Sequence, residues 1–177
     1  AHPSYEITDA TRDGIEDGYA NGGKSEGSKL LQEYSRLRAL MRPRDLWPAR
    51  VTDFAGAWEH FKNDIHARDF TDLIEDCLKE EIDPGFDAAI GLFDEAQDLS
   101  CLEMSLARFW GRNMDKVIFV GDGDQVLYSF RGASSDLGLN PEIPVHVLKN
   151  SYRVSQAVHE FSERIINIIP AEQRLQR

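Results

Sequence analysis

The chain has 177 residues, 41% of them hydrophobic, which suits one domain or two small ones with a buried core. Its formal net charge of −11 argues against a protein that coats nucleic acid through its overall field, but leaves room for a local basic groove. The sequence contains neither a long unbroken apolar run nor a basic and apolar leader. We therefore expect no membrane span, no signal peptide and a cytoplasmic location.

Residues 1–28 are polar, rich in glycine and aspartate, and without period, so they predict a loop or a weakly ordered start. Within them, residues 18–25 (GYANGGKS) match the GxxxxGK[ST] pattern of a phosphate-binding loop. That pattern works only when a buried strand leads into the loop and a helix leaves it. Residues 11–17 are no strand, and the next predicted helix begins only near Ser28, which favours a chance match. The alternative, a P-loop nucleotidase in which Lys24 contacts phosphate, stays open.

Residues 28–83 have the apolar periodicity of helices. Three stripes recur at helical spacing: Leu30, Tyr34, Leu37 and Met41; Phe54, Trp58, Phe61 and Ile65; and Phe70, Leu73, Ile74, Cys77 and Leu78. Pro43 and Pro48 separate the first stripe from the second, and Pro84-Gly85 marks a boundary. We expect a helical subdomain over residues 1–83, including the polar start, and a second unit over residues 84–177.

Cys77 and Cys101 lie on predicted apolar helix faces and are expected to be buried thiols, because the sequence lacks four zinc ligands at recognisable spacing. Five arginines gather in one stretch: Arg36, Arg38, Arg42, Arg44 and Arg50. Two interpretations of this cluster stay open, a patch that contacts phosphates and a solvated helix end with its loop.

Two short apolar runs each end in polar residues. Residues 88–93 (AAIGLF) lead into DEAQD at 94–98, and residues 116–120 (KVIFV) lead into GDGDQ at 121–125. Between the runs, SCLE at 100–103 is typical of a capping box and begins a helix with one apolar face. Strand, helix and strand in this order predict a βαβ unit. A third apolar run, at 145–148, precedes a helix expected from about Ser155.

Asp94 and Glu95 stand where the first predicted strand ends. In open α/β sheets, ligands bind beyond the carboxyl ends of parallel strands. Adjacent carboxylates at that position suit nucleotide hydrolysis, in which one holds Mg²⁺ and the other orients or deprotonates the attacking water. The alternative is a charged strand-to-helix turn without chemistry.

Three motifs, in this order, resemble those of UvrD/Rep-type superfamily 1 DNA helicases from the Walker B box onwards: DEAQD, VGDGDQVLYSFRGA and LKNSYRVSQAVHEF. Residues 67–74 (ARDFTDLI) are similar to the family's DFxDLL helix. The resemblance is strong over residues 67–165 and weak over the first sixty-six. It implies an α/β fold, a partial RecA-like (P-loop NTPase-type) parallel sheet with a helical subdomain inserted before it.

The resemblance also implies a function, an ATP-dependent helicase or translocase that moves 3′-to-5′ on single-stranded DNA and unwinds duplexes. In the family, Walker A and two further motifs lie well upstream of the Walker B box, and the space before residue 94 does not hold them. We therefore interpret the chain as a fragment that lacks these motifs and the second motor domain, and we expect it to be inactive alone. The alternative is a helicase-derived module that binds DNA or a protein without turning over ATP.

Site roles follow from chemistry first and from the resemblance second. Asp94 is expected to hold Mg²⁺, and Glu95 to act as general base. Gln97 fits the DExQD box and is expected among the ATP contacts. Gln125 both donates and accepts hydrogen bonds, which suits a sensor of the γ-phosphate.

Aromatic and basic residues complete the expected site. Tyr128 and Phe130 alternate in an extended segment, so both rings face one side, where they either stack on bases of single-stranded DNA or fill core space. Arg131 is expected to pair with a DNA phosphate or to brace the Walker B carboxylates. The resemblance implies that Tyr152 stacks on adenine and that Arg153 reaches the γ-phosphate. Ser151 departs from the family's NYR motif, in which asparagine directly precedes the tyrosine, and Asn150 stands one place earlier.

Overall fold

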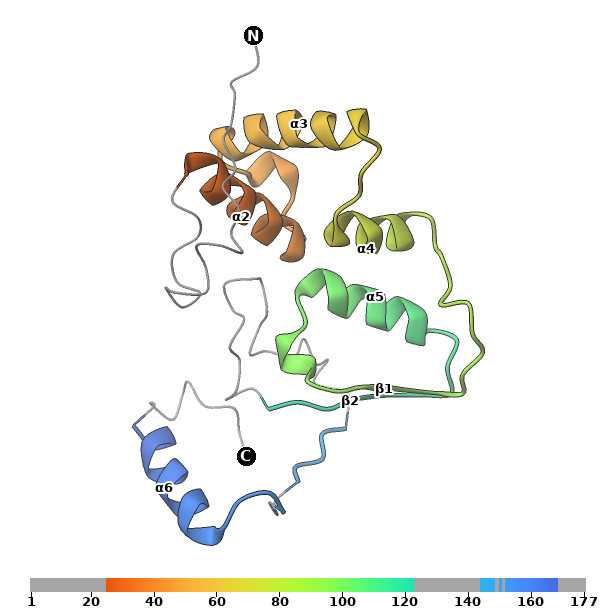
Figure 1. The fold of residues 1–177 in the computed structure, drawn as a ribbon. Helices are drawn as coiled ribbons and strands as arrows, with labels where there is room; N and C mark the ends of the chain where they lie inside the picture. Colours follow the sequence, from red (N-terminus) through yellow and green to blue (C-terminus); the bar gives the residue numbers. More distant parts are fainter. Residues whose placement is uncertain (1–24, 123–143, 149, 151, 169–177) are drawn as a thin grey trace.

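A computed structural model of the chain describes residues 25–122, 144–148, 150 and 152–168 (Figure 1). The helical elements before the sheet are α2 (Glu26–Ala39), the 3-10 turn η1 (Arg44–Leu46), α3 (Ala49–Asp64) and α4 (Phe70–Lys79). They are followed by β1 (Ile90–Phe93), the 3-10 turn η2 (Ala96–Asp98), α5 (Cys101–Gly111), β2 (Lys116–Phe119) and α6 (Gln156–Ile166).

Helices α2 and α3 pack on one another through an aromatic core. Tyr34 and Phe54 are fully buried and meet edge to face, with ring centroids 6.2 Å apart. The buried residues of this core are Tyr34, Leu37, Trp47, Val51, Phe54 and Ala55. Tyr34, Leu37 and Phe54 belong to the first two predicted stripes, which confirms that the periodicity marks a helical pair. Trp47 lies in the loop between the helices, and Val51 and Ala55 lie on α3 outside the predicted stripe.

Several details of the predicted helices are wrong. Helix α2 begins at Glu26, directly after its capping residue Ser25, and not near Ser28. Met41 lies beyond the end of α2, has a positive φ of 52° and is exposed, because the chain turns there toward η1. Phe61, Ile65 and Phe70 are also exposed rather than buried. Cys77 and Cys101 are free thiols but only half-buried.

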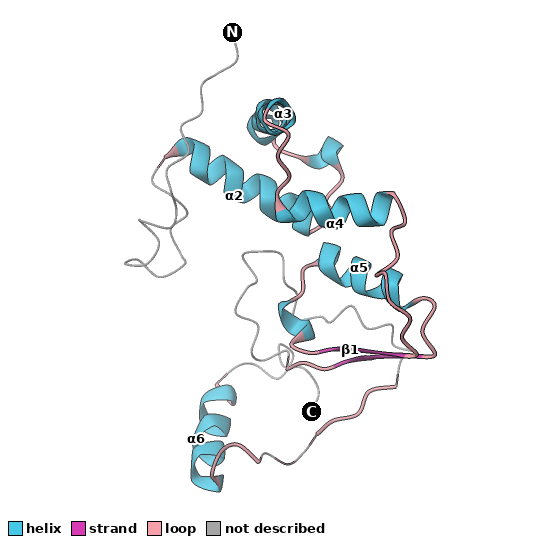
Figure 2. Cartoon of the chain, turned by 45° about the vertical axis from the view of Figure 1, so that its right-hand side comes forward, coloured by secondary structure: helices cyan, strands magenta, loops and turns pink. Residues whose placement is uncertain are grey.

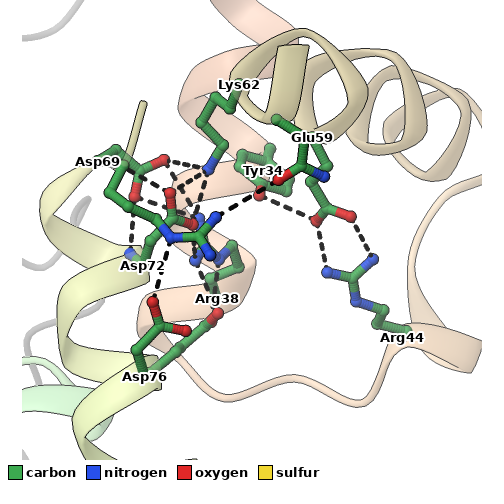
Figure 3. A network of polar contacts seen from close by, with 11 residues as sticks. Tyr34, Arg38, Arg44, Glu59, Lys62, Asp69, Asp72 and Asp76 are labelled. Carbon is green, nitrogen blue, oxygen red and sulfur yellow. Dashed lines mark hydrogen bonds and ion pairs between the residues drawn. The ribbon is translucent and has the colours of Figure 1, made fainter. Parts of the chain in front are cut away.

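Two buried cations join the three helices before the sheet. Arg38 of α2 and Lys62 of α3 are 5% and 4% exposed. Lys62 Nζ lies 2.7 Å from Asp69 Oδ2 and 2.6 Å from Asp72 Oδ2, while the Arg38 guanidinium donates to Asp72 at 2.7 Å (Figure 3). Both oxygens of Glu75 also accept from Arg38, at 2.9 and 2.7 Å. We call these five side chains the cation network.

The same aspartates form the N-terminal cap of α4. The Asp69 carboxylate accepts from the Asp72 backbone N–H at 2.8 Å, and the Asp72 carboxylate accepts from the Asp69 N–H at 2.9 Å. Burial opposes ionisation of Asp72, but hydrogen bonds from Lys62, the Asp69 backbone and Arg38 outweigh it, so the pKa of Asp72 lies below its usual value. The start of α4 is therefore tied to α2 and α3 by charge.

Three of the four remaining arginines of the cluster form ion pairs with glutamates. Arg36 pairs with Glu33, Arg50 with Glu26, and Arg44 with Glu59, which also accepts from the buried Tyr34 hydroxyl. Arg42 is exposed. Charge neutralisation by glutamates favours the interpretation of a solvated helix end over that of a phosphate patch.

Strands β1 and β2 are parallel neighbours, with Ile90 opposite Lys116 and Phe93 opposite Phe119. Helix α5 connects them and lies between the sheet and α4 (Figures 1 and 2). Ser100 and Glu103 form the predicted capping box of α5. The predicted strand, helix and strand are confirmed, and the fold is a mixed one with a small parallel sheet, consistent with part of an α/β domain.

The later elements agree in part with the sequence. Helix α6 begins directly after Ser155 as predicted, but its apolar side chains, among them Phe161 and Ile165, are exposed. Residues 144–148 form no strand in the part of the chain that the structure describes. The boundary at Pro84-Gly85 falls in the connection between α4 and β1, and the division into two domains stays a prediction. In the described segments, no helix has the length and apolar character to cross a bilayer.

The cation network predicts a large penalty for removing one of its carboxylates. Asp72→Asn is expected to lower the free energy of unfolding by about 3 kcal/mol, because two buried cations lose a shared partner. Glu33→Gln removes the partner of the partly exposed Arg36 and is the matched control, with an effect within about 0.5 kcal/mol. Urea unfolding of both variants measures this, and equal losses would contradict the buried network.

Acid unfolding gives a second measure of the same carboxyl. Because the pKa of Asp72 is depressed in the folded state, its contribution to stability is complete above the unfolded value of about 3.9 and is lost as pH falls through the folded value. The chain should lose stability over this range, and Asp72→Asn should lose less over the same interval.

Candidate functional site

The two strands end at one level, and the loops that follow them lie side by side. The rings of Phe93 and Phe119 stack with centroids 5.0 Å apart. Beyond them, the Val120 N–H donates to Phe93 O at 2.8 Å, and the Ala96 N–H donates to Val120 O at 2.8 Å. The DEAQD turn at 94–98 and the segment 120–122 are therefore joined by main-chain hydrogen bonds at the carboxyl edge of the sheet.

Asp94 and Glu95 are both exposed at this edge. The Asp94 carboxylate accepts from the Glu95 backbone N–H at 2.9 Å. Glu95 itself has φ 49° and ψ 38°, the left-handed region that residues other than glycine rarely occupy. Such conformations persist where the surroundings over-determine them, and they gather at functional sites. The backbone at Glu95 thus has a defined and uncommon conformation directly beside Asp94.

Gln97, two residues after Glu95, is 1% exposed. Its Nε2 donates to Glu95 Oε2 at 2.7 Å, and its Oε1 accepts from the Asp122 N–H at 3.0 Å. The amide orientation suits both partners, because the NH₂ group faces a carboxylate and the carbonyl faces a backbone donor. The side chain therefore bridges the two strand-end loops.

Because Gly121 has no side chain, segment 120–122 lies close to Ala96 and Gln97. A Cβ at this position would collide with Gln97 Oε1 and lie 3.1 Å from the Gln97 backbone nitrogen and 3.3 Å from that of Ala96. The sequence pattern did not single out Gly121 as a site residue. Its only signal was a glycine directly after a strand that ends in polar residues, which commonly marks a close backbone contact.

Asp98 has a different environment. Its Oδ1 is buried and has no hydrogen-bond partner among the residues that the structure describes. The capping box of α5 follows it, with the Ser100 N–H donating to Glu103 Oε2 at 2.8 Å. The turn η2 is thus followed directly by the capped start of α5.

A metal at this edge would depend on few protein ligands. Within the described ranges, no three His, Cys, Asp or Glu side chains gather as a metal-binding group. Mg²⁺ typically takes one or two carboxylates together with waters and substrate phosphates. The exposed Asp94 and Glu95 fit that kind of site, in which the nucleotide completes the coordination shell.

The other expected site residues are placed only in part. Gln125, Tyr128, Phe130 and Arg131 lie outside the described residues. Tyr152 and Arg153 precede α6, and both are exposed, Tyr152 to 96%. The structure therefore brings together Asp94, Glu95, Gln97 and the segment 120–122.

Comparison with known proteins identifies similar sequences over this region. The family described as UvrD/REP helicase N-terminal domain matches residues 42–142, more than half of the chain. A probable DNA helicase II homolog of Mycoplasma capricolum is 37% identical over 81 residues, which cover 42% of this chain and 11% of the relative. ATP-dependent DNA helicase UvrD2 of Mycobacterium tuberculosis is 33% identical over 78 residues, 41% of this chain and 11% of the relative. The matches thus span about a tenth of the length of these relatives.

The contact at Gly121 predicts opposite results for two glycine substitutions. Gly121→Ala forces a methyl group against Gln97 and is expected to destabilise the chain by about 1–3 kcal/mol. Gly56→Ala is the matched control, because Gly56 is in the interior of α3 with nothing within 4 Å of the added carbon. It should stabilise by up to about 1 kcal/mol through helix propensity. Thermal unfolding compares the two, and a stabilising Gly121→Ala would refute the close approach.

Proposed function

This chain belongs to the UvrD/REP helicase family, and we propose that it is part of an ATP-dependent DNA helicase that couples ATP hydrolysis to movement on single-stranded DNA. The observation that carries the proposal is the exposed pair Asp94 and Glu95 at the carboxyl edge of a parallel sheet. Unwinding of duplexes and a 3′-to-5′ direction are part of the proposal and come from the motif resemblance alone.

Glu95 is the proposed general base for the attacking water. One of its carboxylate oxygens, Oε2, is held by Gln97, while the exposed side chain remains accessible to water. A carboxylate fixed in this way accepts a proton without first losing rotational freedom. Asp94 is the proposed Mg²⁺ ligand, and the metal, when bound with ATP, neutralises charge on the phosphates.

Further contacts are proposed from the motifs. Gln125 is proposed to sense the γ-phosphate, Arg153 to bind it and Tyr152 to stack on adenine. The planar, permanently charged guanidinium suits phosphate recognition. The exposure of Tyr152 and Arg153 is compatible with contact to a ligand. Tyr128, Phe130 and Arg131 are proposed to contact single-stranded DNA, with base stacking as the sequence-tolerant interaction.

The substitution Glu95→Gln tests the hydrolytic role in the full-length protein. It keeps the shape of the side chain but cannot accept a proton, so ATP turnover should fall about 10²–10⁴-fold while ATP still binds. Asp115→Asn is the control, because Asp115 is an exposed acid just before β2, at the opposite end of the sheet. Steady-state ATPase assays and nucleotide titration measure both properties. Near-normal turnover by Glu95→Gln would remove this residue from the mechanism.

A titration of the chain by itself distinguishes the proposed enzyme part from other kinds of protein. A triphosphate is held mostly by the backbone cradle and lysine of a phosphate-binding loop. Asp94 alone supplies only part of such a shell, so we expect no micromolar binding of Mg²⁺ with a non-hydrolysable ATP analogue, and no ATPase activity. Lys24→Ala and the exposed control Lys29→Ala should leave calorimetric titrations unchanged. Micromolar binding that only Lys24→Ala removes would establish a phosphate-binding loop at residues 18–25.

The same assays distinguish the proposed helicase from the alternative, a binding module that does not turn over ATP. A full-length protein that binds single-stranded DNA but neither binds nor hydrolyses ATP would be such a module. In that case the carboxylate pair would be a charged turn, and Glu95→Gln would leave DNA affinity as it was.

A further inference from the structure

We infer that Gln97 is a positioning residue, which holds the Glu95 carboxylate in place and makes its orientation depend on the segment 120–122 after β2. This inference rests on the proposed function of Glu95. It differs from the expectation that Gln97 contacts ATP, which stays a prediction. Glu95 is exposed to solvent, whereas Gln97, two residues later, is buried.

Burial and bonding leave Gln97 little opportunity to contact a nucleotide. It is 1% exposed, as is its neighbour Ala96, whose N–H is bound to Val120 O. Both polar atoms of the Gln97 amide already have protein partners, Glu95 Oε2 and the Asp122 N–H. A buried amide that gave up either partner for a ligand would leave a polar group unsatisfied.

The link that Gln97 makes is specific to its side chain. The two neighbouring bonds between the loops, Val120 to Phe93 and Ala96 to Val120, are main-chain bonds that do not depend on residue type. The bond from the Asp122 N–H ends on Gln97 Oε1, and the same amide then donates to Glu95. Segment 120–122 is thereby connected to a carboxylate through one glutamine.

Gly121 supports the same conclusion independently. Its backbone lies so close to Gln97 that a Cβ would have no space. Gly121 does not have a positive φ, so its backbone conformation does not require glycine. The close approach to Gln97 is the reason for a glycine at this position. The contact confines the Gln97 side chain from the side of β2, so that its amide is held against Glu95.

Glu95 needs such a support because of its backbone. Its left-handed conformation is sparsely populated for a residue with a side chain. Three hydrogen bonds restrain the residue: its N–H donates to the Asp94 carboxylate, its carbonyl oxygen accepts from the Asp98 N–H, and its carboxylate accepts from Gln97. Of these three bonds, the one from Gln97 acts on the carboxylate itself. Loss of Gln97 therefore leaves the carboxylate chemically intact but free to change rotamer.

Two variants separate the hydrogen bonds of Gln97 from its volume. Gln97→Met has a similar shape without either hydrogen bond. Gln97→Glu retains an acceptor for the Asp122 N–H but places a carboxylate where Glu95 had a donor, so it removes the second link and adds repulsion. If Gln97→Met fails to fold, Gln97→Glu still tests whether the link to Glu95 is needed for catalysis.

The first measurement uses the chain itself and needs no enzymatic activity. Amide NMR spectra should show a shifted and faster-exchanging Asp122 N–H in Gln97→Met, because its acceptor is lost. In Gln97→Glu this amide should be retained, and resonances of the Tyr34 and Phe54 core should stay unchanged in both variants. An unaltered Asp122 amide in Gln97→Met would overturn the bridge.

The second measurement uses the full-length protein and separates positioning from nucleotide contact. Displacement of a catalytic group by about 1 Å can reduce rate by about 10²-fold. We expect both variants to lose kcat on that order, with nucleotide affinity within about twofold of the parent. A weakened affinity with little change in kcat would overturn the positioning role and restore Gln97 as an ATP contact.

The two proposals fail in different ways. A parent protein without ATPase activity would refute the proposed function, and the NMR measurement would still decide whether Gln97 bridges the loops. A parent with ATPase activity and a Gln97→Met variant with unchanged kcat would refute only the positioning role.

Discussion

The parallel register of β1 and β2 is the constraint on which the candidate site depends. Because Phe93 is opposite Phe119, both strands end at one level, and the polar residues after each strand are delivered to the same edge. A shift of one residue would turn every side chain to the other face of the sheet. The main-chain bonds between Val120, Phe93 and Ala96 continue that alignment past the ends of the strands. The adjacency of the DEAQD turn and segment 120–122 is thus a direct result of sheet geometry.

Helix α4 contacts both α2, which precedes it in the chain, and α5, which follows it. Its N-terminus carries the aspartates that neutralise Arg38 and Lys62, so it belongs electrostatically to the helical pair α2 and α3. Along its length it packs against α5, the helix that leaves the DEAQD turn. The motif resemblance at residues 67–74 therefore coincides with a helix that contacts both α2 and α5. Asp69 and Asp72 at its start serve the fold, whereas Asp94 and Glu95 of the DEAQD turn reach solvent.

Local patterns were enough to predict some of this structure. The capping box at Ser100, the apolar periodicity of α2 and α3, and the first strand end at Phe93 depend on residues close in sequence. The second strand ends at Phe119, one residue before the predicted Val120. Arg38 could not be distinguished from its exposed neighbours, because its partners Asp69 and Glu75 are 31 and 37 residues away. The bridge made by Gln97 was equally hidden, since Asp122 follows 25 residues later. Long-range pairing of polar groups has no periodic signal in a single sequence.

The shared ion pairs of the cation network also restrict how the sequence can change. Asp72 contacts both cations, and Arg38 contacts all three carboxylates, so the effect of a substitution at one of these positions depends on the residues at the others. Energies within such a connected group are not additive. Removal of Lys62 changes what Asp69 and Asp72 contribute, and an apolar replacement for one cation leaves the acids with excess charge. These five residues are therefore expected to show epistasis, in which paired changes are tolerated and single changes are not.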